Sequence, residues 1–113
     1  MRKLSLDALV REHLERAAAG SDGRSATTVH GGHEHTLRQT LLALTAGTSL
    51  AEHESPGEAT LLVLRGRVRL TSGDTEWEGR TGDLIVIPPV RHGLEAPEDA
   101  AVLLTVARQD QVY

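Results

Sequence analysis

The chain lacks cysteine and has almost no aromatic residues. Its 113 residues contain no Cys and no Phe, and its aromatic residues are Trp77 and Tyr113. The absence of cysteine excludes disulfide bonds, thiolate metal ligands and cysteine nucleophiles. The scarcity of aromatic rings removes the stacking platforms that single-stranded nucleic acids use, and it predicts a core of aliphatic side chains.

An excess of positive charge and a long apolar run are also absent. Lys and Arg number 12 against 16 Asp and Glu, which gives a formal net charge of -4. Nucleic acid is therefore not expected as a partner, because phosphate binding needs clustered cations. No apolar run approaches the length of a membrane span, and no apolar signal segment follows Met1. We expect a cytoplasmic protein without membrane contact.

The N-terminal part predicts a helix over about residues 6–18, because apolar residues recur there at helical spacing. Ser5 fits the N-cap and Gly20 the C-terminal stop. The apolar stripe is narrow, so we expect this helix to lie on a larger body or on a partner subunit. We therefore divide the chain into a helix and linker over 1–25 and a single β domain over 26–113.

The remainder predicts short strands separated by turn residues, which is typical of a β-sandwich or barrel. One of them, 84–87, is apolar throughout and is expected to be buried on both faces. The expected strands are 27–30, 35–44, 50–53, 59–64, 67–71, 75–78, 84–87, 91–95 and 101–107.

Two stretches of the chain share a layout of glycine and histidine. In the first, five residues separate Gly47 from His53; in the second, Gly82 precedes an apolar strand that leads to His92. This layout resembles the cupin superfamily over about residues 35–107. The resemblance implies an all-β fold, a jelly-roll-like double-stranded β-barrel, here with an N-terminal α-helix, and it implies a homodimer.

The chain departs from the cupin motifs at two of the four positions that hold metal in that family. His53 and His92 match the first and last positions, but Ser55 and Ala59 stand at the other two. Glu58 lies one residue early, and a slip of one residue along a strand turns a side chain to the opposite face. Two imidazoles fall short of the three protein ligands that are usual in a catalytic metal site.

Other histidines could complete a metal site. His33 and His35 share the same parity, so in an extended segment they would face the same side. If that segment lines the barrel mouth, one of them could join His53 and His92 around a divalent metal such as Fe, Mn, Zn, Ni or Cu. The alternative is that they are exposed loop residues, because two glycines precede them.

Two further features have ordinary structural interpretations. Arg65, Arg67 and Arg69 fit the exposed face of an alternating strand, with an anion site as the alternative. Trp77 fits a role in sheet packing or at an interface.

Three functional hypotheses follow. The first is a small-molecule-binding cupin without a full metal site, favouring an apolar or neutral ligand because Ser and Ala replace His and Glu. The second is a metal-dependent oxygenase or isomerase that uses His53 and His92 with His33, His35 or Glu58. The third is a regulatory module that senses a metabolite. The expected cavity residues are His53, Ser55, Ala59, Leu61, Val63, Val86 and His92.

Overall fold

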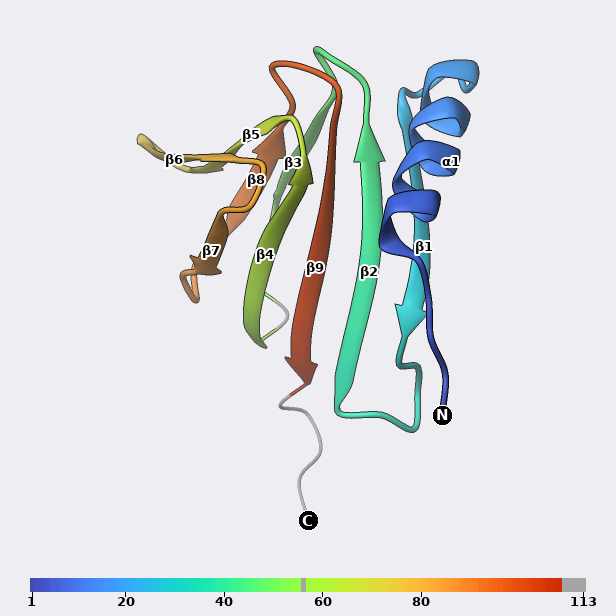
Figure 1. The fold of residues 1–113 in the computed structure, drawn as a ribbon. Coiled ribbons are helices and arrows are strands. Elements are labelled where there is room, and N and C mark those ends of the chain that lie inside the picture. The colour runs from blue at the N-terminus through green and yellow to red at the C-terminus, as the bar shows by residue number, and fades with distance from the viewer. Residues whose placement is uncertain (56, 109–113) are drawn as a thin grey trace.

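A computed structural model describes residues 1–55 and 57–108. It contains one helix followed by strands that form two antiparallel sheets (Figure 1). This confirms the expected all-β, jelly-roll-like fold with an N-terminal helix. The elements are α1 (Leu6–Ala19), β1 (Arg24–His30), β2 (Leu37–Leu44), β3 (Ser49–His53), β4 (Gly57–Arg65), β5 (Arg67–Ser72), β6 (Thr75–Arg80), β7 (Leu84–Ile87), β8 (His92–Glu95) and β9 (Ala100–Arg108).

The two sheets enclose an aliphatic core. One sheet has the strand order β1-β2-β9-β4-β7 and the other the order β3-β8-β5-β6. Within residues 1–55 and 57–108 no strand pairing joins β6 to β7, so the sheets do not close into a barrel. The core between them contains Leu44, Ala59, Leu61, Val63, Val68, Leu70, Ile87, Leu94, Ala96, Ala100, Val102 and Val106.

Helix α1 lies on the outer face of the five-stranded sheet, against β1 and β2 (Figure 1). Its buried side chains are Val10, His13 and Ala17, and the His13 ring nitrogen Nδ1 lies 2.7 Å from the Ser25 hydroxyl. The chain's own sheet therefore covers the narrow apolar stripe, and the helix needs no partner subunit to bury it. Among the described residues, no helix is both long and apolar enough to cross a membrane.

The local signals at the ends of α1 act as the sequence predicts. The Ser5 hydroxyl accepts a hydrogen bond from the Ala8 amide at 3.2 Å, and the Gly20 amide donates to the Arg16 carbonyl at 3.0 Å. Strand β1 begins at Arg24, slightly before the expected boundary between linker and β domain.

The expectation that the apolar strand 84–87 is buried on both faces is wrong. Ile85 and Ile87 face the core, whereas Leu84 is 60% exposed and Val86 is 74% exposed. The reason is that β7 is an edge strand, and only one face of it is covered by the opposing sheet.

The outer face of the four-stranded sheet carries ion pairs. Arg67 donates to Glu78 at 3.3 Å, and Arg69 donates to Glu95 at 2.9 Å. The hydrogen bond to Glu95, followed by the charge of Glu76, raises the pKa of Arg69 above its ordinary value. Arg67 and Arg69 thus belong to the exposed face that the alternation predicts, whereas Arg65 lies on β4 of the other sheet.

The turn between β4 and β5 supplies a test of the fold. Gly66 in this turn has φ +76°, and a Cβ there would collide with the Asp99 carbonyl oxygen. Gly73, in the turn between β5 and β6, is the comparison: it has φ +56°, but a Cβ there would meet no atom. We expect Gly73→Ala to lower the free energy of unfolding by about 1 kcal/mol through backbone strain. Gly66→Ala adds overpacking and should cost roughly 3 kcal/mol or more. Urea denaturation of both variants measures the difference, and equal losses would contradict the described turn.

Candidate functional site

A small cavity lies between the two sheets, with a volume of about 70 Å³. Two histidines supply the ring nitrogens, and the remaining side chains are aliphatic. The lining residues are Leu42, Leu50, His53, Ala59, Leu61, Leu70, Ile87, His92, Gly93, Leu94 and Leu104.

An irregularity in β3 brings His53 to the cavity. Leu50 pairs with Leu94 and His53 pairs with His92, and the register shifts between Leu50 and His53. Without that shift, residues three apart on a strand would face opposite sides. Gly93 on the neighbouring strand β8 allows β3 to bulge, because a Cβ at that position would lie 2.7 Å from the Leu50 carbonyl oxygen. The bulge and Gly93 together place both histidines on the inner face.

The two imidazole rings lie next to each other, with ring centroids 5.0 Å apart and planes tilted by 59°. His92 is 6% exposed, whereas His53 is exposed and marks the mouth of the cavity. The Nδ1 atom of His53 lies 2.9 Å from the Glu54 carbonyl oxygen, and that of His92 lies 2.8 Å from the Val90 carbonyl oxygen. A carbonyl only accepts, so each Nδ1 carries the proton and each neutral ring has an unprotonated Nε2.

Four of the seven expected cavity residues line the cavity, and two aliphatic ones do not. His53, Ala59, Leu61 and His92 are lining residues. Val63 shares the inward face of β4, but its methyl groups pack at the position of Gly79, where a Cβ would lie 3.1 Å from Val63 Cγ2. It is therefore a core residue and the expectation for it is corrected.

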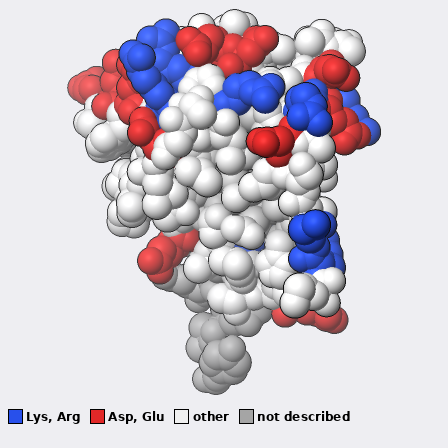
Figure 2. All heavy atoms as spheres, in the orientation of Figure 1, with Lys and Arg blue, Asp and Glu red and all other residues white. Residues whose placement is uncertain are grey.

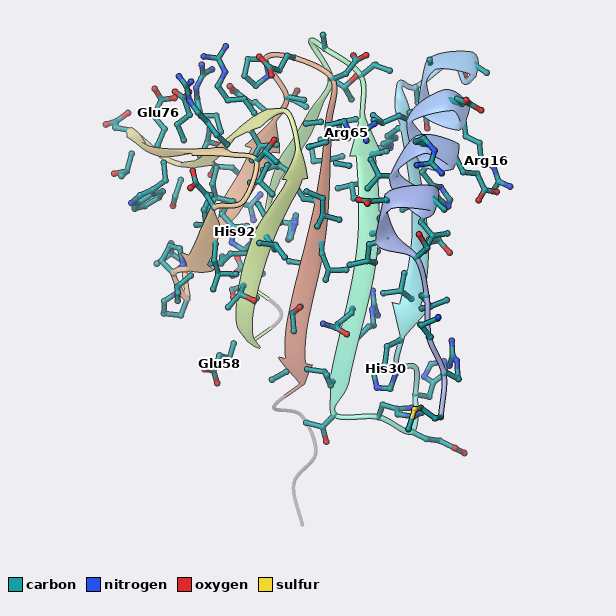
Figure 3. All side chains as sticks on the ribbon, in the orientation of Figure 1. Arg16, His30, Glu58, Arg65, Glu76 and His92 are labelled. Atoms are coloured by element: carbon teal, nitrogen blue, oxygen red, sulfur yellow. The ribbon has the colours of Figure 1, made fainter. Side chains whose placement is uncertain are left out.

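Val86 and Ser55 are also placed differently from the expectation, whereas Glu58 lies on the side that its parity predicts. Val86 pairs with Thr60 on the outward face, and its neighbour Ile87 lines the cavity instead. The Ser55 hydroxyl donates to the Gly57 carbonyl at 3.0 Å and does not line the cavity. Glu58 is exposed on the face of β4 opposite Ala59, as the alternation along a strand requires (Figure 3).

The histidines before β2 do not join the cavity. His33 and His35 are exposed in the loop between β1 and β2, and neither is a lining residue. The His35 ring instead lies edge-on to His30, with centroids 5.2 Å apart. The exposed-loop interpretation of these histidines is therefore the one that the structure supports.

Sequence reasoning missed most of the aliphatic wall. Leu94 could have been found, because it lies two residues beyond His92 on β8 and therefore on the same face. Leu50 could not, because the bulge in β3 changes the parity between it and His53. The other missed lining residues are Leu42, Leu70, Ile87, Gly93 and Leu104.

The donors that face the cavity do not complete a catalytic metal centre. Two imidazoles whose Nδ1–H groups are held by carbonyls suit metal ligation through Nε2. However, Ala59 has no donor atom and Glu58 faces away, and the described residues contain no group of three or more His, Cys, Asp or Glu that could hold an ion. A third protein ligand, which catalytic sites normally have, is missing from this donor set.

Residues 40–107 match the Cupin_2 family, whose description is the cupin domain. No curated protein matches the chain.

Solved structures similar to this one include a protein of unknown function, a cupin superfamily protein and an enzyme. A conserved protein of unknown function from Streptococcus pyogenes is 27% identical with a TM-score of 0.71, over 81% of this chain and 80% of that chain. A cupin superfamily protein from Desulfitobacterium hafniense is 18% identical with a TM-score of 0.76, over 96% and 92%. A salicylate 1,2-dioxygenase from Pseudaminobacter salicylatoxidans is 19% identical with a TM-score of 0.74, over 88% of this chain and 33% of the enzyme.

The hydrogen bonds of the two site histidines predict their tautomers. At a pH where the rings are neutral, we expect His53 and His92 to carry the proton on Nδ1, because each Nδ1 faces a carbonyl oxygen. Long-range ¹H–¹⁵N correlation spectra distinguish the two ring nitrogens, and exposed His33 provides an internal comparison. Protonation of either site histidine on Nε2 would contradict the described geometry.

Proposed function

The chain belongs to the cupin domain family, and we propose that it is a small-molecule-binding cupin. Its ligand is a compact, mainly apolar and neutral molecule, held without a resident metal. The observation that carries the proposal is the pair of Nδ1–carbonyl hydrogen bonds at His53 and His92. They leave two Nε2 acceptors on a cavity whose other lining side chains are aliphatic.

The size of the cavity supports a compact ligand. Its volume of about 70 Å³ is well below the roughly 300–1,000 Å³ of pockets that hold drug-sized molecules. By the same measure one water needs about 10–15 Å³, so the space corresponds to about five waters. A ligand with about five non-hydrogen atoms fits such a cavity in the conformation described.

The chemistry of the wall supports a neutral ligand with one hydrogen-bond donor. Within residues 1–55 and 57–108, no Lys, Arg, Asp or Glu lines the cavity. A charged group placed there would lose its hydration without an opposite charge to compensate, which is costly. An O–H or N–H group could instead donate to Nε2 of His92 or His53 while the rest of the molecule packs on leucine and isoleucine side chains.

A divalent metal is the second candidate, and the same pair of Nε2 atoms favours it. His53 and His92 would hold the ion, and further donors would have to come from the ligand or from water, because Ala59 supplies none. When bound, the ion would supply Lewis-acid chemistry, as in the oxygenase or isomerase alternative. Metal content by mass spectrometry after repletion with Fe, Mn, Zn, Ni and Cu tests this candidate, and a stoichiometric ion lost in His92→Ala would favour it over the metal-free site.

A matched pair of probes tests the metal-free proposal. Pyrrole and furan are apolar five-membered rings of similar size, but only pyrrole has an N–H donor. We expect pyrrole to bind more tightly, by about fivefold, because a net hydrogen bond contributes about 1 kcal/mol. Chemical-shift titration of both probes in the presence of EDTA measures the preference without metal.

Two variants control this test. His53→Phe keeps a ring at the cavity mouth but removes its Nε2, so the preference for pyrrole over furan should fall. His30→Phe makes the same change on an exposed histidine outside the cavity and should leave the preference unchanged. Equal binding of the two probes by the unmodified protein, or binding of neither, would contradict the proposal.

A further inference from the structure

The loop between β1 and β2 brings together two histidines that the cavity does not use. His30 is the last residue of β1, and His35 lies five residues later in the loop. Their ring centroids are 5.2 Å apart and their planes are inclined by 75°. Both side chains are exposed, and Figure 3 shows His30 at the loop end of β1, apart from His92.

A tight turn of the backbone holds the two histidines near each other. The His35 amide donates to the Gly32 carbonyl oxygen at 3.2 Å, which closes the turn. A Cβ at Gly31 would collide with the Leu37 carbonyl oxygen, so the glycine allows the chain to fold back closely after His30. The approach of the two rings is therefore a consequence of the loop's own hydrogen bonding and packing.

The separation of the rings matches that of two imidazoles on one metal ion. Bonds between a metal and a histidine nitrogen are about 2.0–2.1 Å long, which places the ring centroid about 3.2 Å from the ion. Two rings at a tetrahedral or trigonal angle then have centroids roughly 5.2 to 5.5 Å apart. The 5.2 Å between His30 and His35 lies in this range. Because both side chains are exposed, rotation of the rings can point one nitrogen of each at a common ion without a change in the backbone.

The ring nitrogens of His30 and His35 have no hydrogen-bond partner among the described residues. The histidine rings that form hydrogen bonds in that part of the chain are those of His13, His53 and His92. An ion at His30 and His35 would therefore replace water, and no hydrogen bond within the described residues would be lost.

A thioether lines the same surface hollow as His30. This hollow has a volume of about 520 Å³, and Met1 and His30 are both among its lining residues. Figure 1 shows the N-terminal end of the chain beside the β1–β2 loop. The chain has one methionine and no cysteine, so the Met1 thioether is its only sulfur atom. The Met1 side chain is exposed and unbranched, and it can adapt its conformation to bring this sulfur to the histidine pair.

The surroundings of the pair are poor in charged ligands. Within residues 1–55 and 57–108, no carboxylate and no third histidine joins His30 and His35 in a group that could hold an ion. In the space-filling view, most of the Lys, Arg, Asp and Glu side chains on this face gather at the end of the molecule opposite the β1–β2 loop (Figure 2). Arg2 also lines the hollow, but its long side chain is exposed and keeps its charge in water.

This set of neutral donors favours a soft monovalent ion. Zinc sites in proteins are built from Cys, His, Asp and Glu, and Mg²⁺, Ca²⁺ and Mn²⁺ prefer oxygen ligands. A thioether is instead a ligand that selects Cu(I), and imidazole also suits copper. Two imidazoles and one thioether therefore match Cu(I) better than a divalent ion.

We propose that His30, His35 and Met1 form a surface site for one Cu(I) ion. One nitrogen from each imidazole and the thioether sulfur are its three protein ligands. The site shares no residue with the cavity, so it does not depend on what the cavity binds.

A copper titration observed at the single methionine tests the site. Protein labelled with ¹³C in the methionine methyl group gives one such resonance, that of Met1. The titration uses Cu(I) without oxygen and a His53→Gln background, in which the cavity keeps only one of its two imidazoles. We expect one ion to bind and to shift the Met1 methyl resonance until one equivalent is reached. A parallel competition with the Cu(I) chelator bicinchoninate measures the affinity.

Two variants of the same loop form a matched pair. His35→Gln should weaken Cu(I) binding by about tenfold or more, because losing even a hydrogen-bond partner of a metal ligand typically costs that much. His33→Gln makes the same change two residues away, outside the pair, and should leave the affinity unchanged. Oxidation of Met1 to its sulfoxide before copper is added should also weaken binding, because the soft sulfur ligand is lost.

Three results would overturn the proposed site. The first is the absence of Cu(I) binding in the His53→Gln background. The second is binding that His35→Gln leaves unchanged or that His33→Gln weakens equally. The third is binding that does not move the Met1 methyl resonance.

Discussion

The alternation of side chains along β4 is the constraint on which both faces of this molecule depend. Strand β4 is hydrogen-bonded to β9 on one side and to β7 on the other, so its register cannot slip without breaking two ladders. It directs Ala59 and Leu61 into the cavity and Glu58 and Leu62 outward. Because of this register, the Glu58 carboxylate points away from the two histidines. It lies instead at the edge of an apolar outer surface.

The cavity depends on a second, local constraint in β3. The bulge that Gly93 accommodates turns His53 inward beside His92, and backbone carbonyls hold both Nδ1–H groups. The geometry is thus prepared for a partner at Nε2, although the residues that the structure describes supply no third donor. Two oriented imidazoles in an aliphatic pocket are consistent with recognition of a small hydrogen-bond donor. Because backbone carbonyls orient both rings, no metal is needed to hold them in place.

Much of the fold could be predicted from the sequence, because turn residues and apolar periodicity are local signals. The helix and the nine expected strand positions all correspond to elements of the structure. The outward direction of Glu58 also followed from parity alone. What could not be predicted depends on non-local contacts: the uniform apolar run at β7 does not show which face is covered, and the bulge before His53 needs a glycine on a strand far along the chain. For the same reason the full set of cavity-lining residues could not be predicted, because these residues come from several strands that face each other only in the folded protein.

A zinc titration that compares the two faces of β4 tests most directly whether the alternation along this strand keeps a carboxylate away from His53 and His92. Ala59→Glu directs a new carboxylate into the cavity, and Thr60→Glu directs one to the outer face one residue away. Both would be made in a His30→Ala background, because the His30 and His35 rings lie close enough to compete for zinc. We expect Ala59→Glu to gain one tightly bound zinc with the two histidines, and Thr60→Glu and the background protein to gain none. Equal gains in the two glutamate variants, or a stoichiometric zinc in the background protein that Glu58→Gln removes, would contradict it.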